Sequence, residues 1–179
     1  MLRHMPEGQR AKGGERMTLK DNFDAADWAR IVAAPMLAGV AVTAADPGGL
    51  WGAVRESAAA AGALRQGRED AGGSGLVSEI VTAYESSEGR DMARDAIKTL
   101  AKGRKPAEIV EAAVTELGDV SALVAAKAPE AAAQFRAWLK EVAEKVAEAG
   151  TEGGFMGFGG VKVSDAEKAT IDRISDALA

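Results

Sequence analysis

The chain has 179 residues, a formal net charge of -5 and no cysteine. Acidic and basic residues are interspersed and form no basic stripe that could neutralise phosphates, which argues against nucleic-acid binding. Without cysteine there are no disulfides, no thiolate catalysis and no sulfur ligands for a metal, a composition compatible with the cytoplasm.

Alanine supplies much of the 47% apolar content, and runs of β-branched residues are scarce. Because alanine is the best helix former, the composition predicts an all-α protein. No segment repeats with a period of about 20–50 residues, which favours a bundle over a solenoid. We therefore expect a compact all-α bundle of about five to seven helices, in a single domain over residues 17–179.

Residues 1–16 (MLRHMPEGQRAKGGER) are polar and show no apolar period, a pattern typical of a disordered leader. Met17 is a suitable start of its own, so we expect the leader to be an upstream extension or an addition made for expression. The chain's single histidine, His4, lies in it. The domain then has no histidine for a Ser-His-Asp triad or a zinc site, and we predict no catalytic, cofactor-binding or metal-binding residue.

The first predicted helix follows Asp24, a suitable N-cap, and carries Trp28 and Ile31. Pro35 disfavours helical geometry at the residue before it, so we expect the helix to kink or restart there. Residues 31–45 (IVAAPMLAGVAVTAA) form an apolar run of signal-peptide length. Acidic residues precede this run, and it is shorter than the about 20 residues that span a membrane, so we predict a buried helix.

A second helix is expected to begin at Pro47, behind Asp46 as its cap, and to reach Leu64. It includes Trp51, which we predict to be a core anchor. The residues at 57–63 are all small, so a neighbouring helix could approach closely. Residues 66–75 (QGREDAGGSG) then form the clearest loop inside the domain.

Glycine and proline signals divide the rest of the chain. SSEG at 86–89 breaks the helical pattern, Gly103 ends a helix, Pro106 and Pro129 open the next two, and Gly150 ends the second of these. Ser164 and Glu167 form a capping box before the last helix. The predicted core positions on these helices are Val77, Ile80, Val81, Tyr84, Met92, Ala93, Ala96, Ile97, Leu100, Ile109, Val110, Ala113, Leu117, Val120, Val124, Ala132, Phe135, Trp138, Leu139, Val142, Val146, Ile171, Ile174 and Leu178.

The densest group of titratable side chains is YESSEGRD at 84–91, with Tyr84, Glu85, Glu88, Arg90 and Asp91. Such groups could do acid-base work if burial shifted their pKa values. Charged helix ends are common, however, and we interpret this segment as a polar turn with capping serines and a surface ion pair.

Two segments, APMLAGVAVTAADPGGLWG and EGGFMGFGGVKVSDAEKA, together resemble a family of small uncharacterised bacterial proteins. The similarity covers nearly everything after Met17. It implies a bacterial, cytosolic, helical protein and carries no activity or functional residue to this chain.

The most pointed sequence feature is EGGFMGFGG at 152–160, which places Phe155, Met156 and Phe158 among five glycines. Three interpretations are open. The loop at 153–160 plugs one end of the bundle, or exposes an apolar tip to a partner or a membrane, or covers an apolar ligand cavity as a flap. We favour the plug, because an acidic protein seldom leaves three large apolar groups exposed on one loop.

The sequence therefore favours a non-enzymatic helical bundle in the cytoplasm that acts through self-association as a homo-oligomer or through a protein partner. The alternatives are a binder of an apolar small molecule or lipid, a peripheral membrane protein that uses the loop at 153–160, and a carboxylate-based enzyme. No cofactor is expected.

Overall fold

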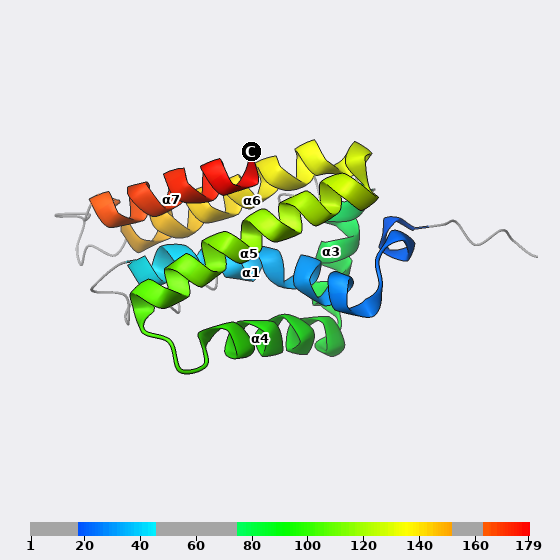
Figure 1. The fold of residues 1–179 in the computed structure, drawn as a ribbon, viewed down its shortest axis with the longest axis horizontal. Coiled ribbons are helices and arrows are strands. Elements are labelled where there is room, and N and C mark those ends of the chain that lie inside the picture. Colours follow the sequence, from blue (N-terminus) through cyan, green and yellow to red (C-terminus); the bar gives the residue numbers. More distant parts are fainter. Residues whose placement is uncertain (1–17, 46–74, 152–162) are drawn as a thin grey trace, which may run out of the picture.

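The computed structural model describes residues 18–45, 75–151 and 163–179 (Figure 1). Within these ranges the chain forms one short 3-10 helix and six α-helices, and no residue in them forms a strand. The elements are η1 (Leu19–Asn22), α1 (Ala25–Ala45), α3 (Gly75–Glu85), α4 (Ser87–Ala101), α5 (Pro106–Lys127), α6 (Pro129–Thr151) and α7 (Asp165–Leu178). The predicted all-α bundle is confirmed. The predictions for residues 1–16, for the helix from Pro47 to Leu64 and for the loop at 153–160 lie outside the described residues.

The apolar helix α1 is the centre of the bundle. It packs against α4, α5, α6 and α7 (Figure 1), and its buried residues include Trp28, Ile31 and Leu37. Among the described helices, α1 alone is long and apolar enough to cross a membrane, with a mean hydropathy of 1.5 over its most apolar window. That window is 61% buried inside the protein, so neighbouring helices cover most of it, as predicted.

The helix was expected to kink or restart at Pro35, and the restart does not occur, because α1 continues through Pro35 to Ala45. Proline has no N–H to donate to the carbonyl four residues earlier and costs a helix interior about 3 kcal/mol. That carbonyl belongs to Ile31. In the same turn, the Tyr84 hydroxyl of α3 donates a hydrogen bond to the neighbouring Val32 carbonyl at 2.7 Å. Pro35 itself is buried. Apolar burial along the whole helix therefore outweighs the local cost of the proline.

Local signals placed most other helix ends correctly. The Asp24 carboxylate accepts a hydrogen bond from the Asp27 N–H at 2.8 Å, which lowers the pKa of Asp24 below its usual value. Gly103 follows α4 with φ of 74°, a conformation that favours glycine. The predicted end of α6 at Gly150 is one residue short, because the helix runs to Thr151.

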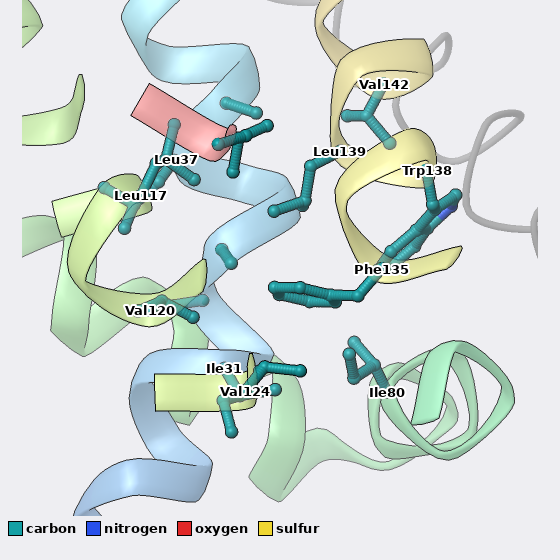
Figure 2. Close-up of a cluster of buried hydrophobic side chains, with 14 of the residues drawn as sticks. Ile31, Leu37, Ile80, Leu117, Val120, Val124, Phe135, Trp138, Leu139 and Val142 are labelled. Carbon is teal, nitrogen blue, oxygen red and sulfur yellow. The ribbon is translucent and has the colours of Figure 1, made fainter. Parts of the chain in front are cut away.

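The core lies where α1 meets α3, α5 and α6. Phe135 is fully buried and its ring centroid is 6.5 Å from that of Trp138. Figure 2 shows Phe135 reaching from α6 toward α1, with Ile80 of α3 close by. The prediction that Phe135 and Trp138 are core anchors is confirmed, whereas Trp51 lies outside the described residues.

The described chain begins with a short segment that is fastened to α3. The Glu79 carboxylate accepts hydrogen bonds from the backbone N–H groups of Leu19 and Lys20, at 2.9 and 2.7 Å. The Lys20 ammonium lies over the Trp28 ring, 5.5 Å from its centroid. These contacts fix η1 at the end of the bundle where α1 starts.

Candidate functional site

The polar group at 84–91 forms the junction between α3 and α4. Ser86 is the N-cap of α4, and its hydroxyl oxygen accepts a hydrogen bond from the Gly89 N–H at 3.0 Å. The Arg90 guanidinium donates to the Tyr84 and Glu85 carbonyls at the end of α3, at 2.7 and 3.1 Å. The Ser86 hydroxyl also donates to the Ala83 carbonyl of α3 at 2.8 Å, so Ser86 and Arg90 join the two helices, which agrees with the predicted polar turn.

The titratable side chains of this junction do not converge on one point. Burial raises the pKa of the Tyr84 hydroxyl above its ordinary value, and the neutral phenol is a hydrogen-bond donor to α1. Glu88 and Asp91 are exposed on α4, and Asp91 pairs with Arg94 at 3.2 Å. Elsewhere in the described ranges, no group of three or more acidic or histidine side chains is placed to hold a metal ion.

A groove of about 420 Å³ lies where the end of α1 meets the start of α5 and the side of α7. Its volume is within the range of small-molecule sites. An ion pair between Arg173 of α7 and Glu111 of α5, at 2.6 Å, lines one part of it. The remaining lining residues are small or apolar: Ala44, Ala45, Pro106, Ala107 and Val110. Sequence reasoning missed this groove because its walls come from three distant segments.

Helix α4 packs on α1 and α3 and lies along one edge of the bundle (Figure 1). Its side toward α1 and α3 is apolar, but only Gly89 and Ala93 on it are buried. Met92, Ile97 and Leu100 pack against the core and remain partly exposed. The apolar stripes of α5 and α6, in contrast, contain many fully buried side chains.

The solvent side of α4 carries a row of exposed charged residues, which we name the α4 charged stripe. Helical spacing places all of its members on one face, and they are Glu88, Asp91, Arg94, Asp95, Lys98 and Lys102. Two pairs in the stripe are in contact, Arg94 with Asp91 at 3.2 Å and Lys98 with Asp95 at 3.4 Å. These four side chains are between 57% and 76% exposed, so the stripe is accessible to a partner.

The predicted interaction loop, with Phe155, Met156 and Phe158, lies outside the described residues. The structure does describe the capping box that follows it. The Ser164 hydroxyl oxygen accepts from the Glu167 N–H at 3.2 Å, and Glu167 accepts from the Ser164 N–H at 2.7 Å. The predicted start of the last helix is thereby confirmed.

Comparisons with protein-family models, with curated proteins and with solved structures each give no match to this chain. The resemblance to a family of small bacterial proteins therefore stays an expectation from the sequence.

Proposed function

We propose that the protein acts through association of helical surfaces, with a second copy of itself or with another protein, and that it is not an enzyme. The observation that carries this proposal is the partial exposure of apolar side chains on α4, together with the charge on its outer side. Its apolar residues Met92, Ile97 and Leu100 are only partly covered, and its outer side is densely charged. Partly exposed apolar side chains give such a surface area to bury on association, and its charges give it specificity.

The rest of the bundle supports such a role by holding α4 in a fixed position. Arg90 and Ser86 tie the start of α4 to the end of α3, through the Tyr84 and Ala83 carbonyls. Tyr84 in turn fastens the end of α3 to the central helix α1. A rigid surface binds a partner with a smaller loss of conformational entropy than a mobile one. We place the protein in the cytoplasm, in line with its acidic, cysteine-free composition and with the burial of α1.

Sedimentation velocity over a wide concentration range, together with native mass spectrometry after lipid extraction, tests self-association. We expect a defined oligomer whose fraction rises with protein concentration and which contains no co-purified ligand. A monomer at every concentration would exclude self-association, and a bound lipid or cofactor would indicate a ligand-binding function instead.

The groove at the end of α1 favours a second candidate function, the binding of a small apolar molecule. Its volume of about 420 Å³ and its mainly apolar lining carry this alternative. Replacing Ala107 by tryptophan places a large side chain at the groove, and replacing the exposed Ala122 of α5 by tryptophan is the matched control.

The mass of the native protein before and after extraction distinguishes the two candidates. If the groove is a ligand site, a co-purified molecule is present in the wild type and in Ala122→Trp and is lost in Ala107→Trp. If the wild type carries no small molecule, and thermal unfolding shows no stabilisation by fatty acids, the alternative is wrong.

A further inference from the structure

We propose that two copies of this chain associate through α4, with the two α4 helices antiparallel across a two-fold axis. The inference rests on the proposed function and names its partner, which is a second copy. It is carried by the order of signs in the α4 charged stripe together with the position of α4 at the edge of the bundle.

The midpoint of the stripe lies between Arg94 and Asp95. Each charged residue of the stripe on one side of this midpoint has a residue of opposite charge at a similar distance on the other side. Two acidic residues, Glu88 and Asp91, lie near the start of the helix, and two lysines, Lys98 and Lys102, lie near its end. Asp91 and Lys98 are equally far from the midpoint and have opposite charges, as do Arg94 and Asp95. Glu88 and Lys102 match to within one residue. The face is therefore complementary to itself when it is reversed.

An antiparallel two-fold contact uses this complementarity fully. In such an isologous interface, each contact between one residue and its partner occurs twice. Asp91 of one copy then faces Lys98 of the other, and Arg94 faces Asp95. A parallel contact would instead oppose like charges along the whole stripe, which disfavours it. The same charge order also suits the dipole of α4 itself, so the stripe is compatible with a stable helix.

The contact should be weak and sensitive to salt. Exposed ion pairs contribute little individually, and Asp91 and Asp95 already have partners within α4 at 3.2 and 3.4 Å. Apolar burial has to supply part of the affinity. Met92 and Ile97, both partly exposed, are also equally far from the midpoint and flank the stripe. Salt screens exposed charges, so the fraction of dimer should fall as ionic strength rises.

Two variants with complementary charges test the proposal on the full chain. The first replaces Glu88 and Asp91 by lysine, and the second replaces Lys98 and Lys102 by glutamate. Each variant repels a copy of itself in the antiparallel arrangement, and the two variants attract one another. The matched control replaces two exposed acids of α6, Glu130 and Glu144, by lysine.

Sedimentation velocity at low salt measures dimer formation, and circular dichroism verifies that each variant is folded. We expect each α4 variant alone to dimerise at least about tenfold more weakly than the wild type. An equal mixture of the two should form dimers again, and the α6 control should match the wild type.

The outcomes separate this inference from the proposed function. If the wild type forms dimers and the α4 variants do so equally well, the α4 contact is wrong and self-association stands. If both variants lose the dimer and their mixture does not regain it, the antiparallel arrangement is wrong. If the wild type is monomeric at every concentration, self-association and this inference both fail.

Discussion

Gly89 lies in the first turn of α4, where that helix starts against the end of α3. A Cβ atom at this position would lie 2.1 Å from the Ala83 carbonyl oxygen and 2.6 Å from its carbon. Both atoms belong to the backbone, so no side-chain rotation relieves the clash. The Gly89 N–H also donates to the Ser86 hydroxyl oxygen at 3.0 Å. Replacing Gly89 by alanine should therefore separate the two helices and disturb the N-cap of α4.

Three effects set the size of the change in the free energy of unfolding. Overpacking typically costs about 1–3 kcal/mol, and disruption of an N-cap costs about 1 kcal/mol. Alanine in place of glycine in a helix returns up to about 1 kcal/mol. We expect Gly89→Ala to destabilise the protein by about 1–3 kcal/mol. For a protein of this size that loss lowers the thermal midpoint by about 2–12 °C.

The same substitution at Gly39 is the matched control. A Cβ atom there would lie 3.5 Å from a methyl carbon of Val146, which is an ordinary van der Waals contact. Gly39 is inside α1, so Gly39→Ala should be neutral or should stabilise the protein by up to about 1 kcal/mol. Urea unfolding followed by circular dichroism measures both variants. If Gly89→Ala is as stable as the wild type, the close packing of α4 on the end of α3 is wrong.

Phe135→Ala should cost about 3–5 kcal/mol of stability in urea unfolding, because it empties a fully buried position, while serine at the exposed Ala137 should change stability by less than about 0.5 kcal/mol. Tyr84→Phe should cost about 0.5–1.5 kcal/mol, because it removes the hydrogen bond from the phenol to the Val32 carbonyl; a loss near zero would show that this hydrogen bond does not stabilise the fold. Burial raises the pKa of Tyr84, the single tyrosine, so the phenol loses its proton at a lower pH in the unfolded state than in the folded state. The stability of the wild type should therefore fall as the pH rises above about 10. This fall should be smaller in Tyr84→Phe. If the loop at 153–160 plugs the bundle, replacing Phe155 and Phe158 by serine should lower stability by about 2–5 kcal/mol and leave the oligomeric state unchanged; full stability with lost association would identify the loop as a contact surface.

Local sequence signals were sufficient for much of the fold. The starts of α5 and α6 at Pro106 and Pro129, and the capping box at Ser164, were predicted where the structure has them. Caps depend on groups within a few residues of each other along the chain. The buried stripe that includes Phe135 could also be predicted from the sequence, because helical periodicity assigns residues to one face before any partner is known.

The candidate surfaces could be predicted from the sequence only in part. The segment at 84–91 was correctly interpreted as a polar turn, since serine caps and helix ends are local features. The sequence also contains the charge order of α4, but periodicity alone does not say whether a charged face is covered by another helix. Only the packing of the described helices shows that α4 lies at the edge of the bundle (Figure 1).

What the sequence by itself determined is the helical class, most helix ends and the inward faces. What only the tertiary structure decided is the continuation of α1 through Pro35, the central place of α1, and the groove beside Arg173. These features depend on contacts between distant parts of the chain. Tyr84 meets Val32 across 52 residues, and Arg173 meets Glu111 across 62. The free energy that settles them comes from burial between helices, and a local pattern does not specify which helices will meet.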